Sequence, residues 1–468
     1  MKGKILFLIL FLGVFVLLLF TSVPTFIKIL FTLNFLVLFI MTFYYLFKDT
    51  KYSPILASFI VFNFLFFIIA PILQTHKVYK SGDLNLSNKL IYNDYLIIKT
   101  SILVLVFNIV FFIFYRYFKA IKYHVKKFPY NKNLPFHIFF LFIISIIILI
   151  FNFEHIQNEY LFNNYSSLKG TTKSALLIKE KIILMIPFPA FILGMYYVKN
   201  VKKTKNFYII FVITILLGLL IFGIKNPLTE KRNALGPIYI TIAFLILPKL
   251  LNTNFKILIF LFFSMVIVFP TISVITHSSH SLDEMMNNPK LIYSGLKERG
   301  IVDTFTSLNY DAFTNFSATI EQVEGDQLSY GYQLSGGIFF FVPRKLWVNK
   351  PVSSGQFIGN YLRDKYGNTG SFTNLSNPFV SEGYLNFGVL GIILFAIFLA
   401  FFMARMVNWI NGNNPLKIAA SFYASIHLIF FLRGDFTNGY AFLLASFIVI
   451  LVIPEVYFYF FKKTKIKL

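Results

Sequence analysis

Long apolar runs recur along the chain, with short polar segments between them. A run of about 20 apolar residues is long enough to cross a ~30 Å hydrocarbon core as a helix. The pattern predicts twelve membrane-spanning helices, at residues 5–23, 26–47, 54–73, 95–115, 135–153, 182–198, 207–224, 235–251, 257–276, 384–404, 415–432 and 437–460. The expected fold class is therefore an all-α polytopic membrane protein.

The first apolar run has a second interpretation. Residues 1–20 follow the basic start MKGK, as a signal peptide would. The stretch after them lacks the small residues of a cleavage site, which favours a retained first span.

Composition supports a lipid environment. Hydrophobic residues make up 57% of the 468, Phe alone occurs 62 times, and charged residues reach only 13%. Soluble domains carry about twice that charge. There is no Cys, which excludes disulfides, thiolate catalysis and cysteine-ligated metal sites.

The positive charges predict the orientation. With the N-terminus in the cytoplasm and twelve spans, the C-terminus is also cytoplasmic. The cytoplasmic segments then hold 22 of the 43 Lys and Arg residues but two of the 19 acids, which leaves +4 of the net +24 outside. This asymmetry matches the positive-inside rule. The cations flank apolar runs and form no stripe with interleaved aromatics, so nucleic acid is not an expected partner.

The chain is expected to be one membrane domain, 1–468, with one large extracytoplasmic loop over 277–383. Charges inside the apolar runs are few and lie near their ends. Ion-coupled transporters usually place ionisable groups near the middle of their spans. The pattern therefore disfavours transport.

Cations gather at the predicted outer ends of the spans. They lie in KNPLTEKRNALGP (225–237), FVPRKLWVNKP (341–351) and FLRGDF (431–436). Fixed cations at this depth suit the paired phosphates of a lipid diphosphate, and Arg binds phosphate through two parallel hydrogen bonds. The candidate binding residues are Arg232, Arg344, Lys350 and Arg433. The alternative is general contact with lipid headgroups.

Two carboxylates are candidates for a catalytic base. Glu382 lies in NPFVSEGYLNFGVLG (377–391), where the large loop returns to the membrane, and Asp311 lies within the loop. Either could take a proton from an attacking sugar hydroxyl. The alternative for Glu382 is a favourable charge at a helix N-terminus. No zinc, calcium or Walker motif occurs, so no metal or cofactor is expected.

Three stretches, FVPRKLWVNKP, NPFVSEGYLNFGVLG and LRGDF, together resemble the O-antigen (oligosaccharide repeat-unit) polymerase family of bacteria, the Wzy type. The resemblance is sharpest over 328–391. It implies a multi-span, metal-independent glycosyltransferase at the outer side of the cytoplasmic membrane. Its substrate would be a polyprenyl-diphosphate-linked oligosaccharide, and the growing glycan would move onto a new lipid-linked repeat.

The resemblance also implies roles and partners. Arg344 and Lys350 would contact the diphosphate, with Arg232 and Arg433 as further cations, and Glu382 or Asp311 would be the base. Membrane lipid, a chain-length regulator and a flippase of the same pathway are the suggested partners. An O-antigen ligase, a flippase for lipid-linked repeats and a structural membrane scaffold stay open as alternatives.

Overall fold

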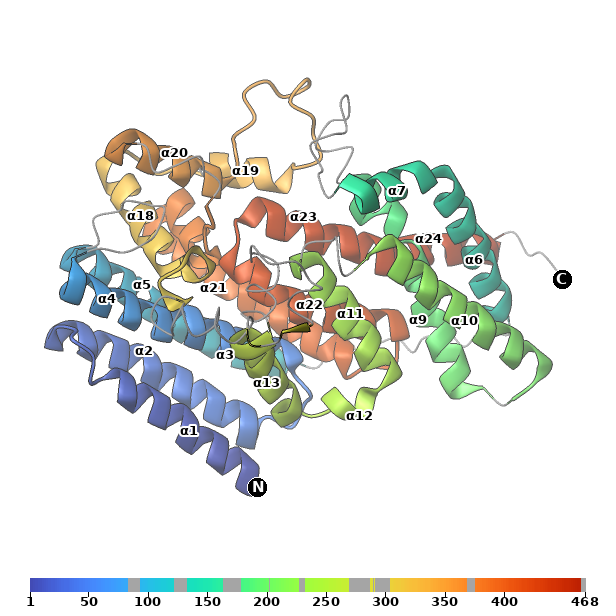
Figure 1. Cartoon of the computed structure of the whole chain (residues 1–468), viewed down its shortest axis with the longest axis horizontal. Coiled ribbons are helices and arrows are strands. Elements are labelled where there is room, and N and C mark those ends of the chain that lie inside the picture. The colour runs from blue at the N-terminus through green and yellow to red at the C-terminus, as the bar shows by residue number, and fades with distance from the viewer. Residues whose placement is uncertain are drawn as a thin grey trace.

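The computed structural model shows a bundle of helices of very different lengths (Figure 1). It describes residues 1–82, 93–121, 133–162, 178–201, 203–226, 232–268, 287–288, 290, 304–367 and 375–463. Every regular element within these ranges is helical, as the apolar pattern predicts.

Residues 2–120 form helices that lie along one another at one side of the bundle (blue in Figure 1). They are α1 (Lys2–Leu18), α2 (Thr25–Phe43, continued by a π-helical turn Tyr44–Lys48), α3 (Pro54–Asn63, continued through a π-helical turn Phe64–Ile69 into α4, Ala70–Ser81) and α5 (Asp94–Ala120).

The middle of the chain forms a second group of helices (green in Figure 1). It consists of α6 (Leu134–Phe151), α7 (Phe153–Phe162), a 3₁₀ turn (Ile183–Met185), α9 (Pro187–Asn200), α10 (Lys205–Ile224), α11 (Arg232–Ile246), α12 (Pro248–Leu251) and α13 (Asn254–Phe263, continued by a π-helical turn Ser264–Val268).

The last third supplies the segments of the candidate site. A 3₁₀ turn (Leu308–Tyr310) precedes α18 (Ala312–Gly325), α19 (Tyr332–Ile338) and α20 (Ser354–Tyr366). The long helices α21 (Phe379–Ile410), α22 (Pro415–Arg433) and α23 (Phe436–Phe447) follow, and a π-helical turn (Ile448–Val452) leads into α24 (Ile453–Lys463).

Nine helical segments of the described residues are long and apolar enough to cross a membrane. They run over Thr25–Lys48, Pro54–Lys80, Asp94–Ala120, Leu134–Phe151, Ile178–Asn200, Lys205–Ile224, Phe379–Ile410, Pro415–Arg433 and Phe436–Tyr459. The other three predicted spans coincide with the shorter apolar helices α1, Leu235–Ile246 and Asn254–Val268. A polytopic membrane protein is confirmed, whereas the count of twelve and the orientation stay predictions.

The centre of the bundle is built from α3, α5, α21 and α22. α21 packs along both α5 and α22, and α3 packs on α22. Residues 54–75 are buried throughout, because other helices surround them. α10, in contrast, exposes large apolar side chains along one side, as expected of a helix that faces lipid.

α21 begins five residues before the predicted span at 384 and is interrupted. Phe387 and Gly388 leave helical geometry, and Gly388 has φ +61°, a left-handed conformation that favours glycine. Across this kink the backbones of Gly383 and Gly391 approach closely: a Cβ at Gly383 would lie 2.7 Å from the Gly391 carbonyl oxygen. The first turns of α21 therefore form a separate short helix, and this short helix carries Glu382.

Candidate functional site

Four segments meet in a buried polar region, named here the convergent cluster. They are the start of α18, the start of α20, residues 375–382 leading into α21, and the junction between α22 and α23. The cluster comprises Asp311, Ser354, Ser376, Asn377, Glu382, Arg433 and Asp435, all buried or partly buried. Charged residues make up only 13% of the chain, so the convergence of Asp311, Glu382, Arg433 and Asp435 marks the region.

Arg433 and Asp311 form an ion pair in the convergent cluster. The Nη2 atom of Arg433 lies 3.2 Å from Oδ1 of Asp311, although the two residues are 122 positions apart. Asp311 is nearly fully buried and accepts two further hydrogen bonds, from Ser376 Oγ at 2.7 Å and from Asn315 Nδ2 at 2.9 Å. The side chain of Arg433 stays 29% exposed. The carboxylate thus holds a guanidinium that other molecules can still reach.

Glu382 lies deeper in the convergent cluster. Its side chain is 1% exposed, and Oε1 accepts hydrogen bonds from the Ser354 hydroxyl and, at 3.0 Å, from the backbone N–H of Phe436. The bond to Phe436 reaches the first turn of α23. Glu382 therefore joins the starts of α20, α21 and α23.

Asp435 caps α23 from within the same cluster. Its Oδ1 accepts from the backbone N–H of Asn438 at 2.9 Å, and Oδ2 accepts from the Asn438 amide at 2.8 Å. Such a cap satisfies N–H groups that the helix itself leaves open. Burial raises the pKa of Asp435, and the hydrogen bonds from Asn438 oppose this rise.

The structure brings only some of the predicted site residues together. Arg433, Asp311 and Glu382 lie in the convergent cluster. Arg344 and Lys350 do not contact it: Arg344 donates to the carbonyls of Lys350 at 2.5 Å and Pro351 at 3.2 Å. Arg232 begins α11, but its side chain lies outside the described part of the chain.

Lys350 likewise forms its hydrogen bonds within its own loop. Its Nζ donates to the carbonyls of Phe340 at 2.8 Å and Val342 at 2.9 Å. Partial burial lowers the pKa of Lys350, and the nearby charge of Arg344 lowers it further. The contacts shown by both cations therefore stabilise the loop backbone.

A second buried charged group was not predicted from the sequence. Glu180 contacts His155 through one carboxylate oxygen and Lys225 Nζ through the other, at 2.8 Å. Glu180 and Lys225 are both 1% exposed. Lys225 begins the polar stretch 225–237, which the sequence pattern assigned to the outer ends of the spans. In the structure α10 ends beside the start of the Ile178–Asn200 helix and encloses them.

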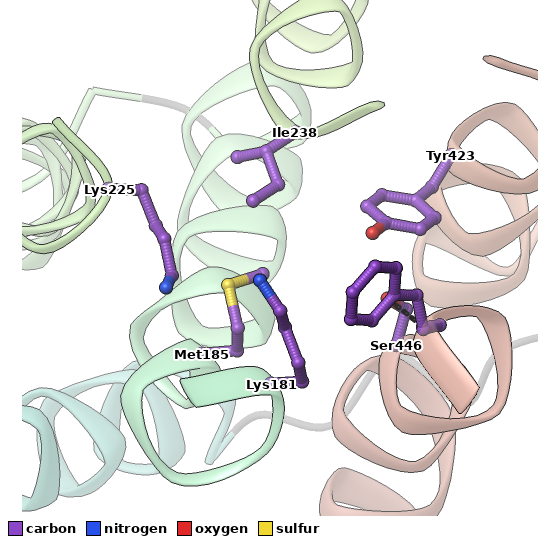
Figure 2. Close-up of a pocket in the computed structure, with 7 residues that line it drawn as sticks. Lys181, Met185, Lys225, Ile238, Tyr423 and Ser446 are labelled. Carbon is purple, nitrogen blue, oxygen red and sulfur yellow. Dashed lines mark hydrogen bonds between the residues drawn. The ribbon is translucent and has the colours of Figure 1, made fainter. Parts of the chain in front are cut away.

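Lys225 also lines a small pocket between the segment that leads into α9, the end of α10, and helices α11, α22 and α23 (Figure 2). Lys181, Met185, Ile238, Tyr423, Phe442 and Ser446 complete its lining. The ammonium of Lys181 lies 4.8 Å from the centre of the Phe442 ring. The pocket is separate from the convergent cluster, and none of the cluster's residues lines it.

Glu180→Gln is expected to destabilise the protein by about 2 kcal/mol, because Lys225 would keep its buried charge and lose the opposing one. Thermal unfolding of the detergent-solubilised protein measures this loss. The double variant Glu180→Gln/Lys225→Met should recover much of it, since the pair is then replaced by neutral groups. Equal stability of Glu180→Gln and the unaltered protein would contradict the prediction.

Among the described residues, no group of three or more His, Asp or Glu side chains is arranged to hold a metal ion. The groups that converge are a guanidinium, carboxylates, hydroxyls and amides. Chemically, this set can bind an anion at the guanidinium and transfer protons between oxygen atoms.

A comparison with known families finds a match that includes the C-terminal residues of the convergent cluster. The family described as O-antigen polysaccharide polymerase Wzy matches residues 373–465. The predicted Wzy-type resemblance is confirmed over this region. The matched residues contain Ser376, Asn377, Glu382, Arg433 and Asp435 of the convergent cluster. No curated protein and no solved structure matches the chain.

The Wzy-type match supports a role in polysaccharide biosynthesis as a transferase, and the apolar helices support its membrane location. Ser354, Ser376 and Asn377 were missed as site residues in the sequence. A signal for them does exist, because SSG (353–355) and LSNP (375–378) are short polar stretches in an apolar chain. SSG spans the start of α20, and LSNP directly precedes α21.

Proposed function

We propose that this protein polymerises lipid-linked oligosaccharide repeat units at the outer face of the bacterial cytoplasmic membrane. The observation that carries the proposal is the partly exposed guanidinium of Arg433, which lies in the region that resembles Wzy polymerases and is held by Asp311, a buried residue outside that region. The substrate would be an oligosaccharide on polyprenyl diphosphate. The product would be a surface polysaccharide such as O antigen.

In the proposed reaction, a hydroxyl of the new lipid-linked repeat attacks the anomeric carbon of the growing glycan. The bond from that carbon to the diphosphate breaks, a glycosidic bond forms, and polyprenyl diphosphate leaves with the electron pair. Arg433 would bind the diphosphate and stabilise the charge that develops on it. In this scheme the guanidinium supplies the positive charge, and no metal or cofactor enters the step.

The hydroxyl proton needs an acceptor, and Glu382 remains the candidate. Its carboxylate is buried, so in this proposal the proton reaches it through Ser354, whose hydroxyl donates to Oε1. Asp311 is better suited to position Arg433 than to act as a base, because Arg433, Ser376 and Asn315 already donate to its oxygens.

Deleting the gene tests the proposed function. The expected result is surface polysaccharide with single repeat units and no long-chain ladder on a gel. Loss of a ligase would instead leave no repeat attached to the lipid A-core, and loss of a flippase would leave lipid-linked repeats on the cytoplasmic side. The family match favours neither alternative. An unchanged ladder in the deletion strain would refute the proposal.

A further inference from the structure

The loop between α19 and α20 exposes a group of large apolar side chains. This loop, residues 339–350, exposes Leu346 by 81% and Val348 by 80%, with Phe339 and Phe341 about half exposed. It projects from the bundle between α19 and α20 in Figure 1. Exposed apolar side chains so close together mark a surface that contacts an apolar partner.

Many backbone N–H and C=O groups of the 339–350 loop form hydrogen bonds within the loop or with its close neighbours. The ammonium of Lys350 donates to two carbonyls of the loop. The guanidinium of Arg344 donates to the carbonyl of Lys350 and to that of Pro351, directly after the loop. The hydroxyl of Tyr332 donates to the Asn349 carbonyl. The N–H groups of Leu346 and Trp347 both donate to the Pro343 carbonyl. Irregular backbone enters an apolar environment only when such groups are paired.

The loop is fixed beside the outer end of a predicted span. Its Phe340 ring meets the Tyr440 ring edge to face, with centres 6.4 Å apart, and Tyr440 lies in the second turn of α23. α19, which leads into the loop, packs directly on α23, and a Cβ at Gly337 would lie 2.8 Å from the Phe436 ring. The loop therefore starts at the depth where α23 begins.

We propose that the 339–350 loop inserts Leu346, Trp347 and Val348 into the outer leaflet of the membrane. The loop combines Leu, Val, Phe and Trp with Arg and Lys. This composition is typical of segments that lie at the boundary between headgroups and acyl chains. Exposed Lys345 provides positive charge for anionic headgroups. Insertion would hold the start of α20, and with it Ser354, at a fixed depth. The inference does not depend on the polymerase reaction.

Tryptophan fluorescence can test this insertion, because the chain has only two Trp residues. Trp409 lies near the other end of α21, so Trp409→Phe leaves Trp347 as the single probe. The full-length variant is reconstituted into bilayers with lipids brominated near the headgroup end of the acyl chain. Trp347 is expected to lose about half of its emission there, since interfacial segments insert about 5–10 Å. It should also be shielded from aqueous iodide.

Leu346→Asp/Val348→Asp in the same background should reduce the bromolipid quenching and increase the iodide quenching. Asp364→Asn on α20, an exposed position outside the loop, is the matched control and should change neither. If Trp409→Phe does not fold, the difference between the unaltered protein and Trp347→Phe gives the same signal. Quenching of Trp347 by iodide, with none by brominated lipid, would overturn the proposal.

Discussion

Arg433→Ala is expected to abolish the long-chain polysaccharide while single repeat units still form. In the proposed reaction Arg433 binds the leaving diphosphate, and removal of one such charged group typically slows a reaction about 100-fold or more. Although Arg433 is partly exposed, its loss also leaves the buried Asp311 carboxylate without its cation, so the stability of the variant must be followed as well. The ladder on a gel, together with the amount of the variant in membranes, measures the effect.

A second variant at position 433 separates the effect of the positive charge from that of the guanidinium geometry, and a variant at Arg363 serves as the control. Arg433→Lys keeps the positive charge but loses the planar pair of donors, so the expected ladder is intermediate in length. Arg363→Ala is the matched control, because Arg363 is exposed on α20 and pairs with neighbouring Asp364. A normal ladder from Arg433→Ala at normal protein level would remove Arg433 from the mechanism and leave the resemblance of residues 373–465 to Wzy polymerases unaffected.

Helices could be predicted from the sequence because membrane spans are specified locally. About 20 apolar residues suffice, whatever they pack against, and the nine long apolar helices among the described residues all fall on predicted runs. Their ends were less predictable. Phe379 to Gly383 carry a polar Ser and Glu, which indicated a loop. In the structure Ser381 donates to Asn377 four residues earlier, Glu382 accepts from Ser354 of α20, and the helix begins there.

The site was only partly predictable because its contacts join distant segments. LRGDF and SLNYDAF each contained a candidate, but nothing in either stretch shows that Arg433 meets Asp311. Arg344 and Lys350 illustrate the converse. Their closely spaced positive charges suggested a phosphate site. In the structure this irregular loop, whose Pro343 lacks an N–H group, leaves carbonyls without backbone partners, and the two cations donate to them.

Gly355→Ala is the substitution with the largest expected effect on stability. Gly355 lies in the first turn of α20, where its Cα faces the backbone of Leu375. A Cβ there would overlap the Leu375 carbonyl oxygen and lie 3.0 Å from the carbonyl carbon. The obstacle is backbone, so no rotation of a side chain relieves it. One of the two segments must move, at a cost of about 3 kcal/mol.

That movement would also disturb the chemistry. The segments beside Leu375 and Gly355 carry Ser376 and Ser354, which donate to Asp311 and Glu382. The variant should therefore lose both thermal stability in detergent and the polysaccharide ladder. Gly325→Ala is the control, because a Cβ at the end of α18 meets nothing within 4 Å, and its stability should change by less than about 1 kcal/mol. If Gly355→Ala melted like Gly325→Ala, the close packing of α20 on residues 375–376 would be wrong, and with it the shared placement of Ser354 and Ser376.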